Sequence, residues 1–84
     1  MMSEASMLLR IVAGVARDVA INGTPKGALH EMCKRLLNVV RPSDVAVTLD
    51  ALAAIERIGD AEVAATVRAT RVALQERTRH YTQL

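Results

Sequence analysis

Three short breaks rich in glycine, proline and capping residues divide the 84-residue chain into four segments. In Asn22-Gly23-Thr24-Pro25, the glycine suits the left-handed position after a helix, the threonine is a good N-cap, and the proline fits the first helical turn. In Arg41-Pro42-Ser43-Asp44, the proline pushes the residue before it out of helical geometry, and two capping side chains follow. In Ile58-Gly59-Asp60, the glycine ends one helix and the aspartate caps the next. These breaks predict four helices, over residues 4–20, 25–39, 44–58 and 60–81.

The apolar residues between the breaks recur at helical spacing, which supports this division. In the first segment they fall at i, i+3, i+4, i+7 and i+11, namely Leu8, Ile11, Val12, Val15 and Val19. The second helix has the stripe Leu29, Met32, Cys33, Leu36 and Val40, and the fourth has Val63, Val67, Thr70, Leu74 and Tyr81. The third segment is apolar around much of its girth. Large and small side chains alternate over residues 45–49, which also suits a short strand, but the sequence predicts no second strand to pair with it.

Short connections favour antiparallel neighbours among helices. We therefore expect one all-α domain over residues 1–84, built as a small four-helix antiparallel bundle or as stacked αα-hairpins. The last two helices form the most clearly predicted hairpin, because the connection between them is so short. A domain of this size buries only roughly 60–65% of its unfolded surface, so it has one modest core.

Composition narrows the class of function. The chain has no Trp and no Phe, so its apolar mass is aliphatic, and its net charge of +2 gives no global argument for binding nucleic acid. The single Cys33 cannot form a disulfide within the chain, which fits a reducing compartment. No signal peptide is recognisable, and no uncharged apolar run reaches the length of about 18 residues that a membrane span needs. We therefore expect a cytoplasmic protein that does not enter a membrane.

Residues for catalysis or metal binding are sparse. His30 and Cys33 lie at i and i+3 on the second helix and make half of a zinc site, but His80 is the only other soft ligand. Cys33 also lies in an apolar stripe, where burial raises the pKa of a thiol and blocks access to it. The carboxylates fit helix capping or solvated surface, and no glycine-rich phosphate loop is present. The sequence therefore predicts no catalytic residues, no metal, no cofactor and no enzymatic activity.

The apolar residues of the last two helices cover more of the helix circumference than the stripe of about 100° with which one helix packs against a core. The fourth helix has a second apolar line at Ala65, Ala69, Val72 and Ala73. We interpret the excess as a contact surface for another protein or for a second copy of the chain. The residues we assign to this surface are Leu52, Ile55, Val63, Val67 and Val72. The sequence thus predicts a small regulator or adaptor that binds protein and self-associates, unless the wide stripe serves two neighbours in one compact bundle.

Binding to nucleic acid is the alternative prediction. The distal part of the fourth helix carries Arg68, Arg71, Arg77 and Arg79, and a long basic helix can lie along a phosphate backbone. Cations near a helix C-terminus also offset the helix dipole, which explains them without a ligand. No aromatic residues are interleaved with these arginines for base stacking. Protein binding is therefore the favoured prediction.

Overall fold

Four helices make up most of the structure, in the places that the three breaks predict. The computed structural model describes residues 4–58 and 60–82, with side chains described as far as residue 79. The helices are α1 (Glu4–Asn22), α2 (Lys26–Val39), α3 (Val45–Ile58) and α4 (Ala61–Thr82), and a 3-10 turn, η1 (Pro42–Asp44), precedes α3. No strand occurs among the described residues, and residues 45–49 belong to α3. The all-α class is therefore confirmed.

The connection between α1 and α2 differs from the prediction by one residue. Gly23 has a φ of 69°, the left-handed conformation expected of it, and the Thr24 N–H donates to the Asp18 carbonyl at 3.3 Å. Pro25, and not Thr24, occupies the N-cap of α2, because its ψ of 136° is extended and keeps it outside the helix. Proline offers no side-chain acceptor, so α2 begins without a side-chain cap.

The later connections follow the predicted capping more closely. Asp60 caps α4 as expected, since its Oδ1 accepts a hydrogen bond from the Val63 N–H at 2.9 Å. Gly59, predicted to end α3, lies outside the described residues. Before α3, the Asp44 N–H donates to the Arg41 carbonyl at 2.9 Å, so Asp44 closes the 3-10 turn and α3 starts one residue later than predicted.

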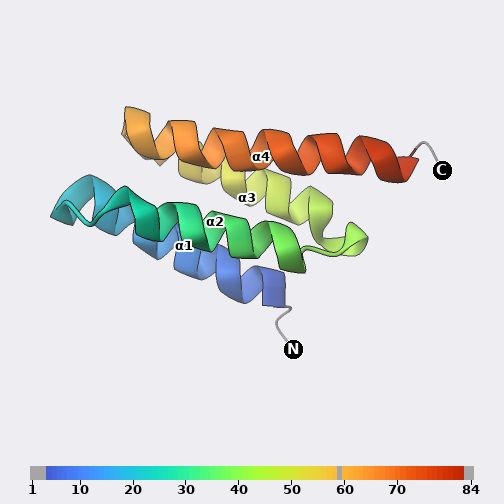
Figure 1. Ribbon diagram of the computed structural model, residues 1–84, viewed down its shortest axis with the longest axis horizontal. Coiled ribbons are helices and arrows are strands. Elements are labelled where there is room, and N and C mark those ends of the chain that lie inside the picture. Colours follow the sequence, from blue (N-terminus) through green and yellow to red (C-terminus); the bar gives the residue numbers. More distant parts are fainter. Residues whose placement is uncertain (1–3, 59, 83–84) are drawn as a thin grey trace.

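The four helices form two stacked αα-hairpins (Figure 1). Helix α1 packs along α2, and α3 packs along α4, in the two most extensive contacts of the molecule. The hairpins then stack with α2 against α4 and α1 against α3. Because the chain reverses direction at each connection, the helices within a hairpin are antiparallel and the stacked pairs are parallel (Figure 1). Of the two predicted arrangements, the structure has the stacked hairpins.

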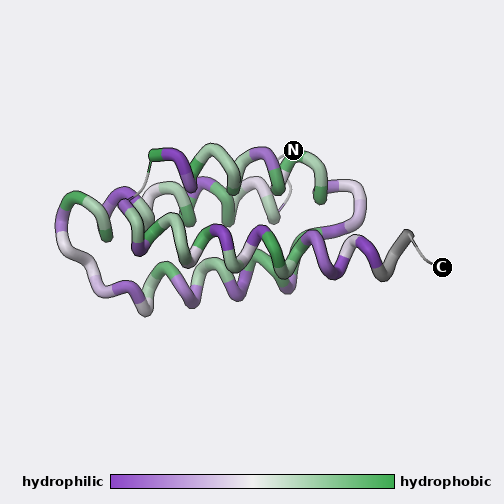
Figure 2. Tube along the Cα trace, turned by 90° about the horizontal axis from the view of Figure 1, so that it is seen from above, coloured by the Kyte–Doolittle hydropathy of each residue, from purple (hydrophilic) through white to green (hydrophobic). Residues whose placement is uncertain are grey.

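Aliphatic side chains from all four helices fill the core between the hairpins. Polar and apolar residues alternate along each helix, so that each has a face to bury (Figure 2). The largest fully buried side chains are Leu29, Leu36, Leu52, Leu74, Val12, Val63, Val67 and Thr48. The buried face of α1 is Ala5, Val12, Ala16 and Val19. Ile11, predicted to lie in this stripe, is 46% exposed, because the small alanines face the core in its place.

Candidate functional site

Four of the five residues predicted to form a contact surface lie in the core. Leu52, Ile55, Val63 and Val67 are all buried within a single chain. Helices α3 and α4 pack against each other and also against the first hairpin, so their wide apolar stripes serve two neighbours each. The prediction of a surface at these four residues is therefore wrong, and the compact alternative describes them. Val72, the fifth residue, is exposed.

Apolar area is nevertheless exposed on both helices, at the predicted second line of α4 and on a side of α3 that the prediction did not name. The second apolar line of α4, which includes Val72, is exposed along its length. On α3, Val47, Ala54 and Ile58 are exposed. Val47 and Ile58 are three turns apart and so lie on the same side of the helix. Of these residues, Ile58 lines a pocket that α3 shares with α1.

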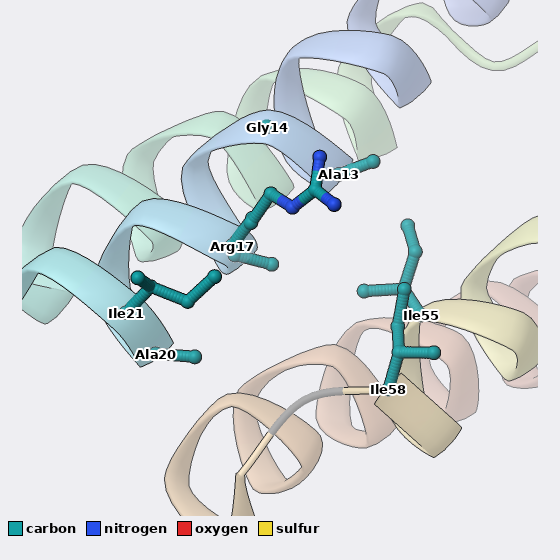
Figure 3. Close-up of a pocket in the computed structure, with 8 residues that line it drawn as sticks. Ala13, Gly14, Arg17, Ala20, Ile21, Ile55 and Ile58 are labelled. Atoms are coloured by element: carbon teal, nitrogen blue, oxygen red, sulfur yellow. The ribbon is translucent and has the colours of Figure 1, made fainter.

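A groove of about 510 Å³ opens between α1 and α3. We call it the α1/α3 groove, and it is lined by Ala13, Gly14, Ala16, Arg17, Ala20, Ile21, Ile55 and Ile58. Side chains of α1 form one wall, and Ile55 and Ile58 of α3 form the opposite wall (Figure 3). Because α1 and α3 run parallel, the groove lies between the C-terminal halves of both helices.

Small residues and exposed isoleucines give the groove an apolar character. Most of the α1 wall is alanine and glycine, and a Cβ added at Gly14 would meet nothing within 4 Å. Ile21 is 71% exposed and Ile58 is 80% exposed. Such large apolar side chains standing beside a groove are typical of protein contact sites. The sequence did offer a signal for them, since each is the last apolar residue before a glycine break.

Arg17 has the one ionisable side chain among the described residues that line the groove. It makes no hydrogen bond or ion pair with any described residue. A guanidinium presents five N–H donors in a planar fork that matches a carboxylate. The groove therefore offers an apolar channel with one unpaired cation in its wall.

A second, shallower pocket of about 310 Å³ lies on the outer side of the first hairpin. We call it the α1/α2 face, and its residues are Glu4, Met7, Leu8, Ile11, Arg35, Asn38 and Val39. Its centre is apolar, with Met7 and Ile11 both exposed. Glu4 and Arg35 are its charged members, and neither forms an ion pair with a described residue.

The arginines predicted to bind nucleic acid are largely engaged within the chain. Glu56 accepts hydrogen bonds from Arg71 Nε at 2.5 Å and from Arg68 Nε at 3.2 Å. The hydrogen bond from Arg71 is the main cause that lowers the pKa of the Glu56 carboxyl, although burial opposes it. Arg77 donates to the carbonyl of Leu37 on α2. Arg79 is exposed near the end of α4. Three of the four arginines thus help to hold α4 on α3 and α2.

The predicted pair His30 and Cys33 is divided between the surface and the core, since His30 is exposed and Cys33 is buried. Cys33 is buried and free, and desolvation raises the pKa of its thiol, although a hydrogen bond with Thr70 opposes the shift. The His30 Nε2 lies 3.5 Å from the hydroxyl of Thr66 on α4. The side chain of His80, the third predicted candidate, lies outside the described part of the chain. Among the described residues, no group of three ligating side chains comes together.

No family model, no curated protein and no solved structure matches this chain. Within the described ranges, no helix is both long enough and apolar enough to span a bilayer.

Proposed function

We propose that this protein is a small, non-enzymatic regulator or adaptor that binds a helix of a partner protein in the α1/α3 groove. The observation that carries the proposal is the groove itself, with the exposed isoleucines Ile21 and Ile58 beside an alanine- and glycine-rich wall. Laying an amphipathic helix into an apolar groove is a recurring mode of peptide recognition. The proposal keeps protein binding as the function that the sequence predicts. It assigns the binding surface to α1 and α3 instead of α3 and α4.

The size of the groove limits what it accepts. From Ala13 to Ile21 the α1 wall is about 12 Å long at 1.5 Å per residue, or roughly two helical turns. A partner helix therefore presents apolar side chains at i, i+4 and i+7 over this length. Because the wall is built of small residues, the partner backbone can approach α1 closely. A carboxylate near the middle of that helix would pair with Arg17, which has no partner in the described chain.

The lining gives no support to a catalytic role. Proton transfer requires titratable groups placed against a reacting atom, and general acid–base sites use pairs of such groups with different pKa values. Among the described residues that line the groove, Arg17 is the one with an ionisable side chain, so the lining offers no such pair. A cytoplasmic location remains part of the proposal, supported by a buried thiol that lacks an intrachain disulfide partner.

Nucleic-acid binding through α4 is the alternative that the sequence predicts, and the ion pairs of α4 weigh against it. Arg68 and Arg71 share one carboxylate, which neutralises part of the charge that a phosphate backbone would need.

Quantitative affinity capture from the source cells tests the proposal with matched surface variants. The wild type is compared with Ile58→Glu, which places a charge beside the groove, and with Val72→Glu, which places the same charge on the exposed side of α4. Both positions are exposed, so neither substitution disturbs the core. We expect proteins that are retained by the wild type and by Val72→Glu and that are lost with Ile58→Glu.

Two results would contradict the proposal. If all three baits retain the same proteins, the groove binds no partner. If Val72→Glu loses them and Ile58→Glu keeps them, the contact lies on α4, as the sequence first suggested.

A further inference from the structure

The α1/α2 face combines an apolar centre with two unpaired charges of opposite sign. Met7 is 55% exposed and Ile11 is 46% exposed, and Leu8 and Val39 lie beside them half-buried. This face is separate from the α1/α3 groove, since the two pockets share no lining residue. It is therefore a second exposed apolar area on a very small molecule.

The two charges lie at opposite ends of this face along the helix axes. Glu4 opens α1, while Arg35 sits one turn before the end of α2, where the antiparallel α2 runs back along α1. Glu4 is thus close to the terminal turn of α2, whereas Arg35 lies toward Ile11 on α1. The face is acidic at one end, apolar in the middle and basic at the other end.

Such a pattern is complementary to itself under a twofold rotation. In an isologous dimer the same surface of both copies is in contact, so that residue i meets residue j and residue j meets residue i. When two α1/α2 faces meet with their helices antiparallel, the acidic end of each copy lies against the basic end of the other. Each unpaired charge then gains one partner in the other copy, so the dimer contains two ion pairs. The exposed apolar centres of the two copies cover each other.

We propose that the α1/α2 face is the interface of a symmetric homodimer, with Glu4 of each copy paired with Arg35 of the other and with Met7 and Ile11 at the centre. This inference rests on the self-association that belongs to the predicted function, but it does not depend on the α1/α3 groove. The groove remains open in the dimer, so each assembly presents two grooves. The pairs act mainly on register and specificity, while the apolar centre supplies the attraction.

Charge reversal distinguishes pairing between copies from pairing within one copy. In Glu4→Arg, both contacts of the dimer become arginine against arginine, and in Arg35→Glu both become glutamate against glutamate. When the two variants are mixed, every contact joins opposite charges again, because each chain meets only the other variant. Pairing within one chain would be restored only by placing both substitutions in the same chain.

The measurement is the dimer dissociation constant from analytical ultracentrifugation at low salt, with circular dichroism to confirm that each variant is folded. We expect a wild-type dimer, at least roughly tenfold weaker self-association of each single variant, and recovery in the equimolar mixture. Ile58→Glu serves as the control and should dimerise like the wild type.

Four results would overturn the inference, of which three concern the α1/α2 face itself. These three are a wild type that stays monomeric, single variants that dimerise unchanged, and a mixture that stays as weak as its components. Loss of the dimer in Ile58→Glu alone would put the second copy in the α1/α3 groove and would also overturn it. The capture experiment on the groove is decided separately, because it measures which other proteins are retained and not the association of the chain with itself.

Discussion

Replacing Thr48 with valine should stabilise the protein, because the Thr48 hydroxyl is buried without a hydrogen-bond partner in the described chain. Its side chain is 1% exposed, and no described group lies within bonding reach of Oγ1. An unsatisfied buried polar group costs about 1–3 kcal/mol, and valine puts a methyl group in nearly the same space. Threonine and valine have similar helix propensities, so α3 itself is little affected. We expect the free energy of unfolding to rise by about 1 kcal/mol, which raises Tm by roughly 4–8 °C in a domain of this size.

Thr70→Val is the matched control for this prediction. Thr70 is also buried, but its hydroxyl donates to the Thr66 carbonyl at 3.0 Å and bonds to the Cys33 thiol. The same substitution there removes satisfied hydrogen bonds and should leave Tm unchanged or lower it. Thermal unfolding is followed by far-ultraviolet circular dichroism, since the chain has no Trp to report by fluorescence. If Thr48→Val lowers Tm as much as Thr70→Val does, the argument from the unpaired hydroxyl is refuted.

Three further predictions follow from the core and from the charges on α4. Leu52→Ala removes a side chain that is 0% exposed and should lower the free energy of unfolding in urea by about 2–5 kcal/mol; a loss well under 1 kcal/mol would show that the site is not packed. The hydrogen bond from Arg71 lowers the pKa of Glu56 from its ordinary 4.5, so its contribution to stability is present above that pH and is lost as the pH falls through the lower folded value. Glu56→Gln should therefore flatten the acid side of the stability profile, and an unchanged profile would argue against the pair. Burial raises the pKa of the Cys33 thiol, so alkylation near neutral pH should be slow in the folded protein and fast in denaturant, whereas rapid labelling of the folded form would contradict its burial.

Helix positions were predictable from this sequence because the signals that set them are local. A glycine in the left-handed conformation at Gly23 and a capping carboxylate at Asp60 act on residues within one turn of themselves. The errors at these boundaries were small for the same reason. Pro25 lies one residue outside α2 because its ψ is extended. The ring of a proline fixes its φ but not its ψ, so this boundary could not be predicted to the residue.

The position of the exposed apolar area was not predictable, because it depends on which sides of the helices the stacking covers. The sequence pattern of a wide apolar stripe on α3 or α4 is the same whether the helix packs against two neighbouring helices or against one helix and a ligand. The stacking of α2 on α4 and of α1 on α3 buries Leu52 and Val67 and leaves Ile58 outside. That choice is made by packing between residues far apart in the sequence, such as Ala16 and Ile55 on the two sides of the groove.

Each hairpin is made from consecutive stretches of chain, and this order has a consequence for synthesis. When the ribosome has produced α1 and α2, the side that Val12, Leu29 and Leu36 turn toward the second hairpin has nothing to cover it. The first hairpin therefore exposes apolar surface until some forty more residues have been synthesised. A chain truncated near Arg41 is expected to aggregate or to be degraded. The second hairpin thus covers the apolar side of the first hairpin and prevents its aggregation.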